Sequence, residues 1–166
     1  MNLHEEGWDD ERALRGAILE EPIKALEPAD PICVSPQTSY REAIEAMNAV
    51  KLGCVFVTED ERLIGILTER DILRHVVGKA DLESPVSQSM TKNPETVRMD
   101  DLIAFALNKM ATGGYRSIPV VDEMDRPVGL VTVRHFVRFI VTLFPAAVLN
   151  LPPDPQLSIA STAEGA

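Results

Sequence analysis

The sequence predicts an α/β fold of the α+β kind, in which two repeated β-α-β-β-α units pack sheet to sheet with pseudo-twofold symmetry after an N-terminal helix. Two observations lead to this prediction. A Gly-x-x-Thr motif occurs twice, with Gly65 and Thr68 in the first copy and Gly129 and Thr132 in the second. Each copy follows an apolar segment typical of a buried strand, and the residues around both copies repeat in register. Such repetition indicates two similar supersecondary units.

The register of the repeat can be followed along most of both units. Six residues of the first unit recur at a constant spacing in the second, namely Pro22, Pro31, Val34, Ala43, Met47 and Val57 as Pro85, Pro94, Val97, Ala106, Met110 and Val120. A unit of about 60 residues buries little apolar surface when it is alone. We therefore expect the two sheets to pack face to face and to form a cleft between the units.

The first element is an N-terminal segment, residues 1–21, with the apolar periodicity of a short amphipathic helix over residues 9–21. The first unit follows over residues 22–80, and Ser39 with Glu42 forms a capping box at the start of its first helix. Its strand, helix, strand, strand and helix are expected at 32–34, 39–53, 54–57, 63–67 and 68–77.

The second unit, residues 81–144, repeats this order, and Asp100 is expected to cap its first helix. Its five elements are expected at 96–97, 100–114, 117–121, 128–131 and 132–143. Residues 145–166 contain several prolines followed by small and polar residues, so we expect a Pro-rich, partly mobile tail.

The composition limits the classes of partner. The 166 residues are 45% hydrophobic and 25% charged, and their net charge of −10, without a Lys/Arg run, argues against a nucleic-acid partner. The most apolar segment, residues 136–149, is shorter than the roughly 20 residues that cross a bilayer. Cys33 and Cys54 are too far apart for a CxxC motif, and we interpret them as small apolar residues in a reducing compartment. We expect a cytoplasmic protein without a membrane partner.

Two tandem units with Gly-x-x-Thr-x-x-Asp after the last strand resemble a pair of cystathionine-β-synthase-type (CBS) domains, also called a Bateman module. The resemblance covers about residues 22 to 143. It implies a regulatory module that does no chemistry itself, binds an adenine nucleotide (AMP, ADP or ATP) or another adenosyl ligand in the cleft, and usually dimerises. The second unit is similar to the family pattern at Met90-Thr91, Thr96-Val97, Ile118-Pro119-Val120-Val121-Asp122 and Gly129-Leu130-Val131-Thr132.

The residues of the motif suit a nucleotide. A helix that starts at Thr68 presents unpaired N–H groups to a phosphate, and Asp71, one turn later, can accept hydrogen bonds from two ribose hydroxyls. The alternative is that Thr68 and Asp71 form only a capping box, which needs no ligand. Val34 and Val97 are expected to form an apolar slot for the base.

The two units differ at the positions that would bind a ligand. His135 stands where the first unit has Asp71, and it either contacts a ligand or is a partly exposed helix histidine. Cys33 replaces Thr96, and Phe56, which replaces Pro119, either fills the base slot or stacks on the base. One functional site, or none, is therefore expected rather than two. The candidate nucleotide-binding residues are Val34, Phe56, Thr68, Asp71, Thr96, Val97, Arg116, Pro119, Thr132 and His135.

Three functions remain open from the sequence. The first is a ligand-sensing module that signals to a separate, unknown effector protein. The second is a structural dimerisation or scaffold module whose sites have decayed. The third, an enzyme, lacks support, because we find no nucleophile–base pair, no metal-ligand spacing and no Gly-rich phosphate loop. We also expect a homodimer built through apolar helix surfaces that include Leu102, Ile103, Phe105, Leu107, Ile72, Val76, Phe136 and Ile140.

Overall fold

The computed structural model describes residue 12 and residues 14–143. The first unit contains β1 (Cys33–Val34), α2 (Tyr40–Val50), β2 (Cys54–Glu59), β3 (Arg62–Thr68), α3 (Glu69–Asp71) and η2 (Ile72–Val76). The second contains α4 (Ile103–Gly113), β5 (Ser117–Val121), β6 (Pro127–Thr132) and α5 (Val133–Leu143). Of three further short elements, η1 (Ile23–Leu26) precedes the first unit, and η3 (Val86–Gln88) and β4 (Thr91–Lys92) lie between the two units.

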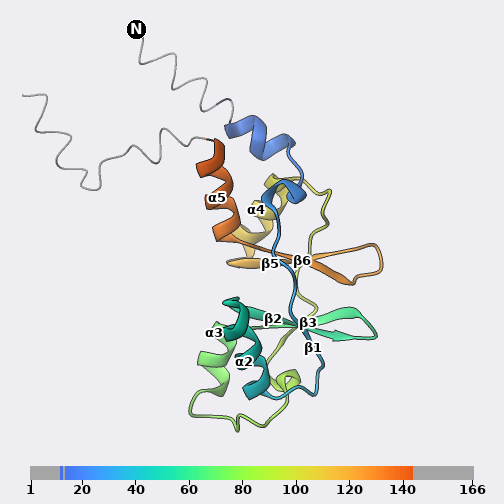
Figure 1. Ribbon diagram of the computed structural model, residues 1–166, viewed down its shortest axis with the longest axis vertical. Coiled ribbons are helices and arrows are strands. Elements are labelled where there is room, and N and C mark those ends of the chain that lie inside the picture. Colours follow the sequence, from blue (N-terminus) through green and yellow to red (C-terminus); the bar gives the residue numbers. More distant parts are fainter. Residues whose placement is uncertain (1–11, 13, 144–166) are drawn as a thin grey trace, which may run out of the picture.

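The two sheets face each other between two layers of helices (Figure 1). Helices α4 and α5 cover the outer face of the β5–β6 sheet, and α2 and α3 cover the outer face of the other sheet. Phe56 and Ile66 of the first sheet and Leu130 of the second belong to one buried cluster, so the inner faces pack directly against each other. The predicted fold, two similar units packed sheet to sheet, is confirmed.

The hairpins of the two units have the same register. Cys54 pairs with Thr68 in the first hairpin, and Ser117 pairs with Thr132 in the second, so each final helix begins beside the start of the preceding strand. Strand β1 is parallel to β2, whereas its expected counterpart at Thr96-Val97 is reduced to one parallel bridge between Val97 and Val120.

The segments that precede the two units are exchanged. Ile23 and Leu26 of η1 are buried in the core of the second unit, although the first unit follows them in the sequence. Conversely, Val86 of η3 is buried in the core of the first unit, and β4 pairs with β3. We call residues 22–29 and 85–92 the leading segments. Each core is therefore completed by the leading segment of the other repeat.

Glycines make room for both leading segments. A Cβ atom on Gly65 would lie 3.2 Å from the backbone oxygen of Thr91, and one on Gly129 would lie 2.9 Å from the Cβ atom of Pro28. Contacts this short are closer than ordinary van der Waals packing allows. The glycine of each Gly-x-x-Thr motif thus lets a leading segment cross the sheet.

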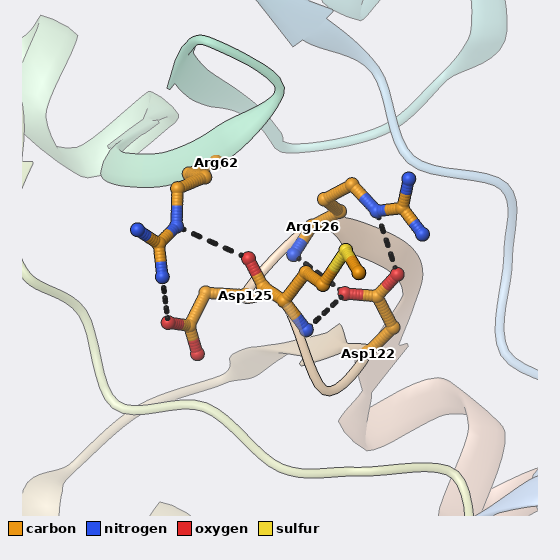
Figure 2. A network of polar contacts seen from close by, with 5 residues as sticks. Arg62, Asp122, Asp125 and Arg126 are labelled. Carbon is orange, nitrogen blue, oxygen red and sulfur yellow. Dashed lines mark hydrogen bonds and ion pairs between the residues drawn. The ribbon is translucent and has the colours of Figure 1, made fainter.

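The turns of the two hairpins also meet, at the ends of the sheets away from α3 and α5 (Figure 1). Arg62 donates hydrogen bonds to the backbone oxygen of Met124 (3.2 Å) and to Asp125 Oδ2 (3.2 Å), as Figure 2 shows. The Leu63 N–H donates to the backbone oxygen of Asp125 at 2.9 Å. The Asp122 carboxylate, which accepts bonds from the backbone and the side chain of Arg126, shapes the receiving turn.

Helix α4 starts differently from the prediction. Its N-cap is Leu102, which provides no side-chain bond, and Asp100 instead forms an ion pair with Lys24 at 2.8 Å. The prediction that Asp100 caps this helix is wrong. The acceptor at the helix start is instead the backbone oxygen of Glu21, the residue just before the first leading segment. The Ile103 N–H donates to the backbone oxygen of Glu21 at 2.9 Å. By contrast, the predicted capping box of Ser39 and Glu42 is present.

Three apolar residues expected on the helix surfaces are core residues. Val76, Ile103 and Phe136 are buried, because they lie on the faces of their helices that pack against the sheets. Cys54 is buried as a small apolar residue would be, but Cys33 is exposed.

The remaining predictions concern the ends of the chain. Residues 14–20 are helical, which agrees with part of the predicted N-terminal helix, and Ile18 packs against the second core. Residues 1–11 and the predicted tail at 145–166 lie outside the described residues. Among the helices of the described part of the chain, none has the length and apolarity that crossing a bilayer requires.

Candidate functional site

The starts of α3 and α5 lie at matching positions of the two units. The Glu69 N–H donates to the backbone oxygen of Gly53 at 3.0 Å, and the Val133 N–H donates to that of Arg116 at 3.1 Å. Burial raises the pKa of the Cys54 thiol to about 11, and the nearby Ser117 side chain offsets part of this rise. Cys54 and Ser117 begin β2 and β5 and pair with Thr68 and Thr132, so their proximity places the two helix starts at one edge of the paired sheets.

The first helix start is a complete capping box. Asp71 Oδ2 accepts hydrogen bonds from the Thr68 N–H at 2.9 Å and from the Thr68 hydroxyl at 2.7 Å. In return, the Asp71 N–H donates to Thr68 Oγ1 at 3.3 Å. Within the described residues, the other carboxylate oxygen of Asp71 has no hydrogen-bond partner. The cap therefore uses one oxygen of Asp71 and leaves the second available as an acceptor.

The second helix start is capped by a histidine. His135 Nδ1 lies 2.9 Å from the Thr132 N and 2.9 Å from the Thr132 hydroxyl oxygen. Since an amide N–H can only donate, Nδ1 must be unprotonated, and the proton of the neutral ring is on Nε2. Burial lowers the pKa of His135, and the nearby Arg138 and Arg134 lower it further, whereas the backbone of Thr132 offsets part of this decrease. His135 is 9% exposed, so the expectation of a partly exposed helix histidine is wrong.

The residues expected around the base are mostly core residues. Phe56 is 1% exposed and packs between the sheets, which fills space there. Pro119, its counterpart, is also buried, and its backbone oxygen accepts a bond from the Val97 N–H at 3.0 Å. Val97 is buried, whereas Val34 is half-buried and pairs with Val57. Of these apolar residues, Val34 has the most surface to offer a ligand.

Thr96 and Arg116 are the two remaining candidates. The backbone oxygen of Thr96 accepts a bond from Lys109 Nζ at 3.1 Å, and the same ammonium pairs with Glu95. The Arg116 side chain is exposed next to the start of α5. The contacts thus join Thr68 with Asp71, Thr132 with His135, and Val97 with Pro119.

Sequence reasoning missed the contact between Cys54 and Ser117. The signal was available in part, because the two residues are equivalent positions of the repeat, and equivalent positions that lie beside a pseudo-twofold axis are close to each other. A cavity of about 420 Å³ lies elsewhere, at the start of α4, and is lined by Asp100, Asp101, Leu102 and Phe105. In the described part of the chain, no group of three or more His, Cys, Asp or Glu residues is placed to hold a metal ion.

Solved structures of other proteins share this architecture. The CBS domain pair of protein MJ0100, in complex with 5′-methylthioadenosine and S-adenosyl-L-methionine, aligns with a TM-score of 0.67 and 24% identity over 74% of this chain and 97% of that chain. The CBS domain protein PAE2072 from Pyrobaculum aerophilum, complexed with AMP, aligns with a TM-score of 0.66 and 24% identity over 85% of this chain and 99% of that chain. At these identities the likeness concerns the fold.

Sequence comparison gives the same family. An uncharacterized 17.7 kDa protein of Acidianus ambivalens is 33% identical over 106 residues, which are 63% of this chain and 64% of that protein. A CBS domain-containing protein of Arabidopsis thaliana is 39% identical over 107 residues, but the match spans only 20% of its length. The CBS domain family model matches residues 23–78 and 85–142, one match for each unit. The chain therefore belongs to the CBS domain family and carries two of its domains in tandem.

Proposed function

We propose that this protein is a regulatory module that binds an adenine nucleotide or another adenosyl ligand between its two CBS units. The observation that supports this most is the start of α3, where Asp71 keeps one carboxylate oxygen outside the cap. The free carboxylate oxygen can accept hydrogen bonds from ribose hydroxyls. We assign ribose binding to Asp71, whose carboxylate Thr68 holds in place through two hydrogen bonds.

The ligand class has further support from proteins of the same fold. One was solved with AMP and another with 5′-methylthioadenosine and S-adenosyl-L-methionine. These ligands share an adenosine moiety, with its base and ribose, and differ at the 5′ position. A site that grips the ribose accommodates all of them, which agrees with the assignment of Asp71.

The second unit offers a weaker ribose site. His135 Nδ1 is already used by Thr132, and the neutral ring has no second acceptor. We therefore propose that the α3 side binds the ligand with the higher affinity.

The substitution Asp71→Asn separates capping from ligand binding. The amide oxygen of Asn can still accept from Thr68, but its NH₂ group replaces the free carboxylate oxygen and cannot accept from a ribose hydroxyl. Isothermal titration calorimetry with AMP, ADP, ATP and S-adenosyl-L-methionine should show binding by the unmodified protein. Affinity should fall about tenfold or more in the variant, since hydrogen bonds to charged groups contribute about 1.5–3 kcal/mol.

Glu69→Gln is the matched control, because it removes one carboxylate from the same helix turn without touching the capping box. It should bind like the unmodified protein. If none of the ligands binds, the alternative of a dimerisation module without a ligand is correct. Equal affinity of the Asp71→Asn variant and the unmodified protein would remove the assigned role of Asp71.

We also infer that the module forms a homodimer and signals to a separate effector protein. Helices α4 and α5 expose large apolar side chains on their outer faces, including Phe105 (47% exposed), Val133 (49%) and Val137 (54%). Sedimentation velocity at micromolar concentration should show a dimer, and Val137→Glu should convert it to a monomer because the charge cannot be buried. Met124→Glu, on the exposed β5–β6 turn, should remain dimeric. A monomeric unmodified protein would contradict this inference.

A further inference from the structure

The two helix starts use acceptors that respond differently to protons. In the first unit the acceptor is the Asp71 carboxylate, and in the second it is His135 Nδ1. An unperturbed Asp ionises near pH 4 and an unperturbed His near pH 6.5. Mild acid reaches the range in which an ordinary imidazole takes up a proton, which lies above the range of an ordinary carboxylate.

Two donors converge on His135 Nδ1. The Thr132 hydroxyl can rotate and become an acceptor when the ring is protonated, but the Thr132 N–H cannot. A protonated Nδ1 would place two N–H groups opposite each other. The bond that caps the backbone is therefore lost on protonation, and the ring, which is 9% exposed, carries a positive charge away from water.

The charges around His135 do not compensate for its protonation. On α5 itself the neighbouring charges are Arg134 and Arg138, and both oppose a positive ring. From η1 and the residue after it, Lys24 pairs with Asp100, and the Glu27 carboxylate lies 3.5 Å from Arg138. Arg138 also donates to the backbone oxygens of Leu26 and Glu27.

The other elements packed against α5 add little charge. Strand β6 contains no charged residue, and Arg116 is bound to α5 through its backbone oxygen. On the opposite helix start, Glu69 is an acidic neighbour of Cys54. No carboxylate in the described residues forms a hydrogen bond or ion pair with the His135 ring.

We propose that His135 is a pH-sensitive cap, which holds the first turn of α5 when its ring is neutral and releases it when Nδ1 is protonated. This device acts on the second unit alone, because the first unit has a carboxylate at the same position. The proposal does not depend on ligand binding.

The sign of the effect follows from proton linkage. In the unfolded chain the His135 ring binds a proton around pH 6.5, and in the folded chain it does so only at lower pH. Between these two values the unfolded state holds more protons, so the stability of the fold decreases as the pH falls. His135 alone should make the equilibrium constant for unfolding up to about tenfold larger at about pH 5.5 than at about pH 7.5.

Two measurements on the full chain test the proposal. Nitrogen-15 NMR of the histidine rings should show the Nε2–H tautomer of His135 at about pH 7.5 and a pKa of His135 below the ordinary value of about 6.5. Urea unfolding at about pH 5.5 and about pH 7.5 should show that His135→Asp, which restores a carboxylate cap, lacks the loss of stability that protonation of His135 causes. His75→Gln should keep it.

A His135 ring that is protonated at Nδ1 near pH 7.5, or that titrates at or above the ordinary histidine value of about pH 6.5, would overturn the proposal. So would a His135→Asp variant with the same pH dependence as the unmodified protein. If that variant does not fold, the NMR titration of the unmodified chain decides alone.

Discussion

Thr68 and Thr132 occupy the same position in the two units, and each is followed three residues later by a side chain that accepts hydrogen bonds from it. In one unit the acceptor is the Asp71 carboxylate, and in the other it is an imidazole nitrogen of His135. Both acceptors bind the N–H of the threonine, and in the first unit the Asp71 N–H also donates back to the Thr68 hydroxyl. What differs is the group left over: a carboxylate oxygen that accepts, or a ring N–H that donates.

The glycines of the motif give a prediction at the same scale. Gly129→Ala should lower the free energy of unfolding by about 1–3 kcal/mol, because overpacking forces neighbours apart. The new Cβ would lie 2.9 Å from Pro28 and 3.2 Å from Met99. Chemical denaturation measures the change.

Gly16→Ala is the control for this substitution. Its Cβ would meet nothing within 4 Å, and it lies in the helical residues 14–20. It should leave stability unchanged or raise it by about 0.5–1 kcal/mol, because Ala favours helix. If Gly129→Ala is as stable as Gly16→Ala, then Gly129 is not required for the crossing of the first leading segment.

At the level of the elements, local patterns predicted local structure. The capping boxes at Ser39 and Thr68 involve residues three apart, so the sequence alone identifies them. The cap by His135 could also have been predicted, since a neutral imidazole offers an acceptor at the same spacing. Asp100 does not cap α4, because the backbone oxygen of Glu21, which is distant in the sequence, accepts the hydrogen bond from the Ile103 N–H at the helix start.

Non-local contacts account for what the sequence did not predict. The burial of Phe56 depends on Leu130 from the other unit, and no local pattern contains that pairing. The exchange of the leading segments has the same origin. The repeat shows that two segments are equivalent, but it does not show which core each one enters.

The exchange itself can be tested with paired core substitutions. Ile23→Ala should destabilise the chain by about 2–5 kcal/mol, as for other buried Ile residues. Its main effect on amide hydrogen exchange should be in α4 and α5, because Ile23 packs in the second core. Val86→Ala should instead reduce protection in β2 and β3, because Val86 packs in the first core. The exchange would be contradicted if Ile23→Ala reduced protection mainly in the first unit and Val86→Ala mainly in the second.

At the scale of the whole molecule, two kinds of contact hold the units together besides the exchanged leading segments. One is the apolar cluster of Phe56, Ile66 and Leu130 between the sheets. The other is the contact of the hairpin turns, where the Arg62 and Asp125 side chains are more than half exposed. An exposed ion pair contributes little energy, so the cluster supplies stability and the turns supply orientation.

The exchanged leading segments also set an order of events during synthesis. A chain that emerges from the ribosome with its first unit complete in sequence still lacks Val86 and β4, so that unit cannot finish its sheet until residue 92 has appeared. Residues 22–29 must in turn wait for the core of the second unit. Unlike tandem domains that fold one after the other as they are made, these two units can reach their final structures only together.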